Sequence, residues 1–160
     1  MRLGELLHED VVKLHLQAST KQEAIEELVD VLIDAHEIPF SMRSHILEVI
    51  TEREDQASTG MEHGVAIPHG ASDRIEDTIA ALGISPEGIP FNSLDGVSAR
   101  IVVLLITPRR NYQGQVATLG GIAHLFQNAK LREQLRAAPD TDSVLRVIRW
   151  EESKGGVPSM

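Results

Sequence analysis

The chain of 160 residues is 42% hydrophobic and 3% aromatic, contains no cysteine and has a formal net charge of −9. This composition predicts a single domain over residues 1–150 with a flexible tail over residues 151–160, and it excludes disulfides, thiolate metal sites and a base-stacking nucleic-acid surface. Residues 1–62 hold 14 acids and 5 bases, a sum of −9, which predicts either a surface for a basic protein partner or a solvated acidic face without a partner.

No segment of the sequence predicts a membrane span or a secretory leader. The longest uncharged apolar run covers residues 101–106, far short of the roughly 20 residues that a membrane helix needs. The first residues include an acid where a signal peptide would be basic and then apolar. We therefore expect a cytoplasmic protein that does not insert into membranes.

The first expected elements are a short strand and a capped helix. Residues 12–16 alternate between apolar and polar side chains, which is typical of a half-buried strand. Thr20 and Glu23 have the spacing of a capping box, in which two side chains satisfy the free amides at a helix start. Apolar residues then recur at helical spacing, and this helix is expected to end near His36.

A second helix is expected after a short connector that contains proline. Ser41 is the predicted N-cap, and the helix should run to about Glu54. Arg53 therefore lies at a helix end. Taken alone, Arg53 would be interpreted as a surface residue paired with Glu52 or Glu54, an ion pair worth only ~0–1 kcal/mol.

Three strands are expected in the middle of the chain. Residues 65–67 form a short apolar run, and residues 77–84 form a longer one followed by a predicted loop over residues 85–90. Residues 100–107 are the most apolar run and are rich in β-branched side chains. Such a run is typical of a central strand that helices cover on both faces.

A helical pattern resumes at Gln113. The side chains expected to face the sheet are Val116, Leu119, Ile122, Ala123 and Phe126. Gly120 and Gly121 within this helix each cost roughly 1 kcal/mol relative to alanine, so we expect a close backbone contact there. Residues 130–137 and 141–150 predict two further helices. The order of elements predicts an α/β fold, a three-layer α/β/α sandwich on a mixed β-sheet.

The candidate functional stretch covers residues 58–70, where hydroxyls and histidines lie among glycines. Pro68 removes a backbone donor and holds the preceding residue extended, so His69 is expected just past the end of a strand. Gly64 and Gly70 allow close backbone approach on either side. By spacing alone, a single histidine beside proline and glycine is more often an ordinary loop residue than a functional one.

The sequence contains no strong metal or cofactor motif. His63 and His69 with Glu62 could be interpreted as metal ligands, but a separation of six residues fits neither a helical pair nor a finger pattern. There is also no Walker loop, no dinucleotide fingerprint and no Gly-x-Ser-x-Gly motif. We therefore expect neither a metal nor a cofactor.

Three motifs at fixed spacings favour a functional interpretation of His69. They are Thr-Glu-Arg-Glu at residues 51–54, Ser-Thr-Gly at 58–60 and Gly-Val-Ala-Ile-Pro-His-Gly at 64–70. Together they resemble the active-site segment of the enzyme IIA domains of the bacterial phosphotransferase system. The resemblance is to the fructose/mannitol class (type 2), most closely to its nitrogen-regulatory branch, and extends more weakly over nearly the whole chain.

The resemblance implies a phosphocarrier with the same three-layer fold. It implies that His69 accepts a phosphoryl group from the carrier HPr or a paralogue, with Arg53 beside it. A guanidinium is a good partner for phosphoryl oxygens, and we expect Ser58 and Thr59 to add hydroxyl donors. The attacking imidazole nitrogen must be neutral, and no metal is needed because the leaving group is another imidazole nitrogen.

One position departs from the family pattern. Many members carry a second histidine at the start of the helix after the central strand, and here that position aligns with Gln115. Glutamine can donate and accept hydrogen bonds but cannot become cationic, so we expect Gln115 to bind the phosphoryl group with weaker electrostatic help. Two roles therefore stay open. The first is regulation, in which the phosphorylation state of His69 changes binding to target proteins. The second is a sugar-transport subunit that passes the group to a permease IIB domain.

Overall fold

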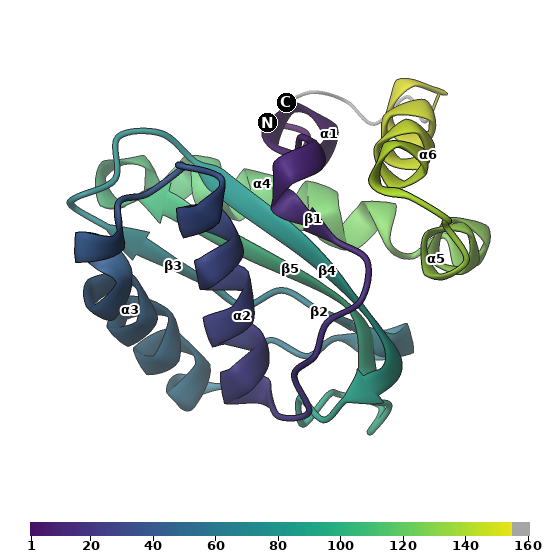
Figure 1. Ribbon diagram of the computed structural model, residues 1–160, viewed down its shortest axis with the longest axis horizontal. Helices are drawn as coiled ribbons and strands as arrows, with labels where there is room; N and C mark the ends of the chain where they lie inside the picture. Colours follow the sequence, from purple (N-terminus) through teal and green to yellow (C-terminus); the bar gives the residue numbers. More distant parts are fainter. Residues whose placement is uncertain (155–160) are drawn as a thin grey trace.

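The computed structural model describes residues 1–154 (Figure 1). In chain order, its α-helices and β-strands are α1 (Leu3–Leu6), β1 (Val12–Lys13), α2 (Lys21–Asp34), α3 (Arg43–Gln56), β2 (Val65–Ala66), β3 (His69–Ser72), β4 (Ile79–Ile89), β5 (Ala99–Pro108), α4 (Tyr112–Leu125), α5 (Ala129–Arg136) and α6 (Thr141–Lys154). The order of helices and strands follows the sequence prediction except for α1 and β3, which were not predicted.

Strand β5 is the centre of a mixed sheet. The sheet has five strands in the order β1-β4-β5-β2, and β3 also pairs with β5. Strand β4 runs antiparallel to β5, whereas β2 and β3 follow one another along the opposite edge and run parallel to it. Nearly every residue of β5 is buried, which confirms the prediction of an apolar central strand.

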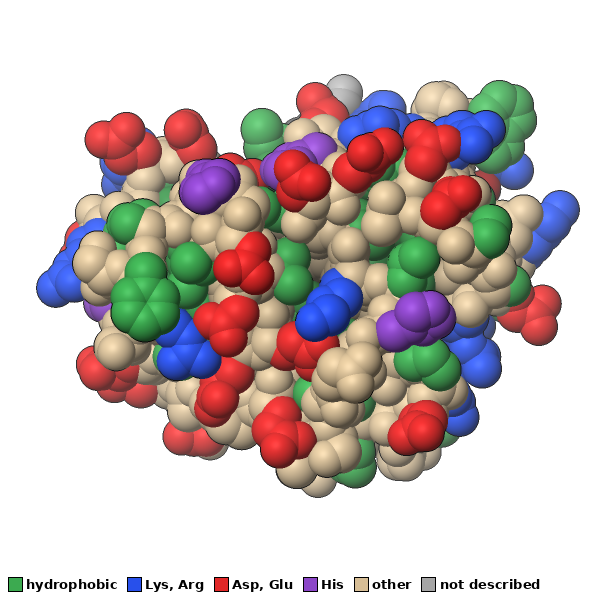
Figure 2. Space-filling model, viewed as in Figure 1, with side chains coloured by type: hydrophobic (Ala, Val, Ile, Leu, Met, Phe, Trp, Pro, Cys, Tyr) green, Lys and Arg blue, Asp and Glu red, His purple; other side chains and the backbone are tan. Residues whose placement is uncertain are grey.

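Helices cover both faces of this sheet. In Figure 1, α2 and α3 lie in front of the strands, α4 lies behind them, and α5 and α6 lie to one side near α1. This arrangement confirms the predicted α/β fold with three layers. Figure 2 shows the same front face with Asp and Glu side chains spread over it. Glu23, Asp34, Glu48 and Glu52, from α2 and α3, are among the exposed acids.

The predicted start of α2 is confirmed in detail. The Thr20 hydroxyl accepts a hydrogen bond from the Glu23 amide at 3.1 Å, and the Glu23 carboxylate accepts one from the Thr20 amide at 3.2 Å. A cap of this kind is typically worth about 1 kcal/mol. The buried stripe of the helix consists of Ala24, Ile25, Leu28, Val29 and Leu32.

Three of the predicted boundaries, those of α3, β1 and β4, are wrong. Ser41 does not cap α3, because it lies in a 3-10 turn and Met42 is the N-cap without a side-chain hydrogen bond. Strand β1 stops at Lys13, although the amide of Leu16 still donates to the carbonyl of Ile84 at 2.8 Å. Residues 85–89 of the expected loop over residues 85–90 are instead the end of β4, which continues through an irregularity in its pairing with β5.

The buried face of helix α4 matches the expected one only in part, since Ile122 and Phe126 are buried and Leu119 packs against the core as predicted. Its buried residues are Gln115, Thr118, Ile122 and Leu125, whereas Val116 is 53% exposed. Apolar periodicity placed Val116 inside and overlooked Gln115 and Thr118, because these two inward side chains are polar. The close contact expected at Gly120 and Gly121 is also wrong, since nothing in residues 1–154 lies within 4 Å of a Cβ built on either glycine.

The end of the chain is more ordered than predicted. Helix α6 continues to Lys154, so residues 151–154 are helical rather than part of a flexible tail. The Glu152 carboxylate accepts hydrogen bonds from the amides of Leu3 and Gly4 at 2.9 Å, which ties α6 to the start of α1. Burial raises the pKa of Glu152. The rest of the predicted tail, residues 155–160, lies outside the described residues.

Candidate functional site

His69 lies where one strand ends and the next begins. Strand β2 stops at Ala66, and Pro68 interrupts the ladder because it has no amide to donate. The Pro68 carbonyl nevertheless accepts a hydrogen bond from Leu105 at 3.0 Å, so the chain stays beside β5. His69 therefore follows a strand end, as predicted, but it also opens strand β3, which the sequence did not predict.

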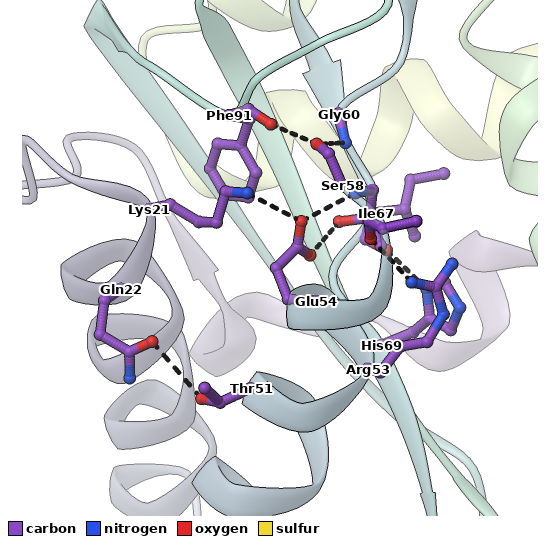
Figure 3. A network of polar contacts seen from close by, with 12 residues as sticks. Lys21, Gln22, Thr51, Arg53, Glu54, Ser58, Gly60, Ile67, His69 and Phe91 are labelled. Atoms are coloured by element: carbon purple, nitrogen blue, oxygen red, sulfur yellow. Dashed lines mark hydrogen bonds and ion pairs between the residues drawn. The ribbon is translucent and has the colours of Figure 1, made fainter.

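The orientation of the His69 ring assigns its proton. Nδ1 lies 2.7 Å from the carbonyl oxygen of Ile67 (Figure 3). A carbonyl oxygen can only accept, so Nδ1 carries the hydrogen and Nε2 keeps its lone pair when the ring is neutral. Nε2 has no hydrogen-bond partner within residues 1–154 and is the nitrogen that can act as a nucleophile.

Burial is the main influence on the protonation of His69. It lowers the pKa of the ring below its ordinary value, the hydrogen bond to Ile67 raises it, the positive charge of Arg53 lowers it further, and the negative charge of Glu54 raises it. Desolvation disfavours the cationic ring. The balance keeps His69 neutral near pH 7, the form that nucleophilic attack requires.

Arg53 stands beside the imidazole at the end of α3 (Figure 3). Its Nη1 donates to the carbonyl of Ala57 at 2.8 Å, in the loop that follows the helix. Within the described residues it forms no ion pair with Glu52 or Glu54, so the interpretation as an ordinary paired surface arginine does not fit. The remaining donors of its guanidinium are available to an anionic group bound at the ring.

The two predicted hydroxyl donors are engaged within the loop. Ser58 donates to the carbonyl of Phe91 and accepts from the amide of Gly60, the latter at 3.0 Å. The Thr59 hydroxyl donates to the Glu54 carboxylate at 2.5 Å. In this structure both hydroxyls hold the loop in place. A direct contact of either residue with a phosphoryl group stays a prediction.

Glu54 is the residue of the site that the sequence interpretation missed. Its side chain is buried, with only 6% of the residue exposed. Besides the Thr59 hydroxyl, it accepts from the Thr59 amide at 2.8 Å and forms an ion pair with Lys21 at 3.1 Å. A signal was present in the sequence, because Glu54 follows Ile46 and Ile50 at four-residue spacing on the buried face of α3.

Gln115 lies next to the site but is turned inward. The residue is 6% exposed, and its amide nitrogen donates to the carbonyl of Gly70 at 3.1 Å and to the Thr107 hydroxyl at 2.7 Å. Gly70 directly follows His69 and must be small, since a Cβ there would lie 2.6 Å from a methyl group of Val49. Gln115 therefore connects α4 to β3 and β5, and its proposed contact with a phosphoryl group stays a prediction.

The other histidine of the segment does not join His69. The ring of His63 lies 3.7 Å from the Glu62 carboxylate, and both side chains are more than half exposed. His63 adopts a left-handed backbone with φ of 66°, which turns the chain between Glu62 and β2. Within residues 1–154 no three His, Cys, Asp or Glu side chains are grouped so that they could hold a metal ion.

None of the described helices is both long and apolar enough to cross a membrane. The family model for the EIIA 2 component of the phosphoenolpyruvate-dependent sugar phosphotransferase system matches residues 5–150. The chain is 30% identical over 152 residues to the fructose-specific EIIABC component of Bacillus subtilis, covering 95% of this chain but 24% of that relative. It thus spans about a quarter of that relative's length.

Relatives of similar length carry two kinds of name. One is the fructose-specific EIIA component of Haloferax volcanii, with 28% identity over 87% of this chain and 89% of the relative. Another is the nitrogen regulatory protein of Bradyrhizobium diazoefficiens, with 27% identity over 92% of this chain and 95% of the relative. The sugar-specific and nitrogen-regulatory relatives therefore match at similar identity.

Solved structures share the fold. The crystal structure of nitrogen regulatory protein IIA-Ntr from Neisseria meningitidis superposes with a TM-score of 0.83 at 24% identity, covering 91% of this chain and 98% of that one. Enzyme IIAMTL from Escherichia coli, solved in complex with phosphorylated enzyme IIBMTL, gives a TM-score of 0.75 at 23% identity, covering 90% and 97%.

Proposed function

Because the chain belongs to the EIIA type 2 family of the phosphoenolpyruvate-dependent sugar phosphotransferase system, we propose that it is a phosphocarrier whose His69 accepts a phosphoryl group from an HPr-like protein. The observation that carries the proposal is the hydrogen bond of 2.7 Å between Nδ1 and the Ile67 carbonyl. It leaves Nε2 with a free lone pair, so the phosphoryl group is accepted at Nε2.

The transfer needs neither a general base nor a second substrate. The Nε2 lone pair forms a bond to phosphorus while the bond between phosphorus and the donor's imidazole nitrogen breaks. The electron pair of the broken bond returns to the donor ring, which leaves as a neutral imidazole because its other nitrogen carries a proton. Nδ1 of His69 keeps its proton, so the phosphorylated His69 ring takes over the positive charge that the donor ring loses. Both ends of the reaction are imidazole nitrogens, so positioning and charge stabilisation supply most of the catalysis.

Arg53 is the group that stabilises charge during this transfer. Its guanidinium lies beside His69, and after burial, the main cause, its positive charge also lowers the pKa of the ring. A planar fork of donors suits the equatorial oxygens of a phosphoryl group in flight. Ser58, Thr59 and backbone amides of the same loop are the further donors in our proposal.

Labelling by a phosphorylated HPr carrier tests the proposal. Intact mass should show one phosphoryl group on the wild type, stable to base and labile to acid, and none on His69→Ala. His63→Ala is the matched control, because His63 lies in the same segment but its ring is exposed and lies against Glu62. Equal labelling of His69→Ala, or loss of the label in His63→Ala, would refute the assignment.

We further propose that the phosphorylation state of His69 acts mainly in regulation. The supporting observation is Gln115, a neutral amide that donates inward at the position where many members of the family carry a second histidine. Without a second cation, onward transfer receives less electrostatic help. The target would then be a regulated protein that binds one state of His69 more tightly than the other.

The second candidate is a sugar-transport IIA subunit that passes its phosphoryl group to a IIB domain. The Haloferax relative, named as a fructose-specific EIIA component and similar in length, supports this role. Transfer assays with a permease IIB domain separate the two roles. Release to the IIB domain as fast as the group is received would favour transport, whereas slow release together with state-dependent binding of another protein would favour regulation.

A further inference from the structure

A chain of hydrogen bonds leads from a buried carboxylate to the reactive imidazole (Figure 3). Glu54 accepts from the amide of Thr59 at 2.8 Å and from its hydroxyl at 2.5 Å. The Thr59 carbonyl accepts from the amide of Ile67 at 3.2 Å. The Ile67 carbonyl then accepts from Nδ1 of His69 at 2.7 Å. In this chain of hydrogen bonds, Ile67 alone connects Thr59, which Glu54 holds, to the His69 ring.

The carboxylate at the start of this chain is itself fixed from the other side. Lys21, the first residue of α2, reaches Glu54 at 3.1 Å and lies 5.6 Å from the centre of the Phe91 ring. The Phe91 carbonyl accepts from Ser58, the neighbour of Thr59. A buried carboxylate is tolerated when a cation and hydrogen-bond donors surround it, and this one has both.

By holding the loop, Glu54 also affects the position of the Arg53 guanidinium. Arg53 precedes Glu54 in the sequence, and its Nη1 holds the carbonyl of Ala57 at 2.8 Å, in the loop that leads to Thr59. If the loop moved away from α3, both the Ile67 carbonyl and the position of the Arg53 guanidinium would change. Displacements of about 1 Å at an active site can slow a reaction by about a hundredfold.

We propose that Glu54 is a positioning residue for phosphoryl transfer: by holding Thr59 it fixes the Ile67 carbonyl that keeps the His69 proton on Nδ1 and Nε2 free. The part of the inference that concerns the transfer rate rests on the function proposed above. The part that concerns the proton can be measured on the unphosphorylated protein. A carboxylate that served the fold alone would change stability without moving this proton.

Two substitutions of Glu54 separate these roles. Glu54→Gln keeps the shape and one acceptor oxygen but loses the ion pair with Lys21, and Glu54→Leu loses every acceptor. Glu52→Gln removes one negative charge from an exposed position on the same helix, and Ile148→Val removes a methylene from the fully buried core of α6. The first control matches the change in charge, and the second matches a loss of stability.

Nitrogen NMR shifts of the neutral imidazole report which ring nitrogen carries the proton. We expect His69 of the wild type and of both controls to carry it on Nδ1. Glu54→Gln and then Glu54→Leu should show a growing share with the proton on Nε2. Labelling by a phosphorylated carrier, corrected for the folded fraction, should slow by about tenfold to a hundredfold in the same order.

An unchanged proton position in Glu54→Gln and Glu54→Leu would overturn the proposal, whatever happens to their melting temperatures. If Glu54→Leu does not fold, the proton position in Glu54→Gln, compared with that in Glu52→Gln, tests the proposal without it. Failure of the wild type itself to take a label would overturn the proposed function. The proton position in the variants would still decide the role of Glu54.

Discussion

The end of α3 and the start of α4 both reach the beginning of strand β3, but they bring different chemistry to it. From α3 come a guanidinium beside the ring and a buried carboxylate, Arg53 and Glu54, one residue apart. From α4 comes Gln115, whose amide donates to the backbone of Gly70 and to Thr107. One helix end presents charge to the site, and the other contributes a neutral structural link.

The two helix ends should therefore have different roles around His69. Charge near a transferring phosphoryl group stabilises the transition state, whereas a buried amide that satisfies a backbone carbonyl stabilises the fold. Substitutions on the α3 side should therefore change the rate of phosphoryl transfer more than stability. Substitutions on the α4 side should do the reverse, unless they add a charge.

Arg53→Ala should have the largest effect on the α3 side. Loss of one preorganised donor typically slows an active site by about 10² to 10³. The melting temperature should hardly change, because the side chain is partly exposed and makes one hydrogen bond to Ala57. Labelling time courses and thermal unfolding measure the two quantities. A large drop in melting temperature with an unchanged rate would make Arg53 structural and remove the contrast between the helix ends.

Gln115→His would add a cation on the α4 side and so weaken the contrast. We expect the rate of transfer to change by about tenfold, equivalent to about 1.4 kcal/mol, with a smaller change in the equilibrium of transfer. Stopped transfer assays with an HPr-like donor and a IIB acceptor measure both steps.

The matched control for this substitution is Gln115→Leu, which removes the amide without adding charge. It leaves the Gly70 carbonyl without its partner and should cost about 1–3 kcal/mol of stability. The labelling rate of the folded variant tests the predicted contact of Gln115 with the phosphoryl group, because a rate equal to that of the wild type would rule this contact out. If Gln115→His and Gln115→Leu have identical rates, a cation at position 115 does not assist the transfer. The absence of a cation at position 115 would then no longer favour regulation over sugar transport.

The smallest expected effect is on pH dependence. Burial of the ring lowers the pKa of His69 in the folded protein below the ordinary value of about 6.5. Between the folded and unfolded pKa values the unfolded chain binds more protons. The free energy of unfolding should therefore be highest above pH 6.5 and should decrease as the pH falls toward the folded pKa. Urea unfolding of wild type and His69→Gln across this range should show the decrease in the wild type only.

Local patterns in the sequence predicted much of this arrangement. The capping box of Thr20 and Glu23 involves residues three apart, and the apolar run of β5 is continuous, so neither depends on distant partners. The position of His69 after a strand end followed from Pro68. These features are decided within a few residues, and they are confirmed.

The polar interior could not be predicted in the same way. Glu54 is buried because Lys21 and Thr59 satisfy it, and Gln115 is buried because Gly70 and a hydroxyl of β5 satisfy it. The spacing of apolar residues does not predict such partners, since they come from other elements of the chain. The overlooked burial of Gln115 in α4 and the missed role of Glu54 have this one cause.

The nitrogen that carries the phosphoryl group tests the central claim most directly. Protein labelled with ¹⁵N at histidine, phosphorylated by an HPr-like carrier, can be analysed by correlated hydrogen, nitrogen and phosphorus NMR. We predict that phosphorus is coupled to Nε2 of His69 and that Nδ1 keeps its hydrogen, held by the Ile67 carbonyl. Coupling of phosphorus to Nδ1, or to any other residue, would contradict the account.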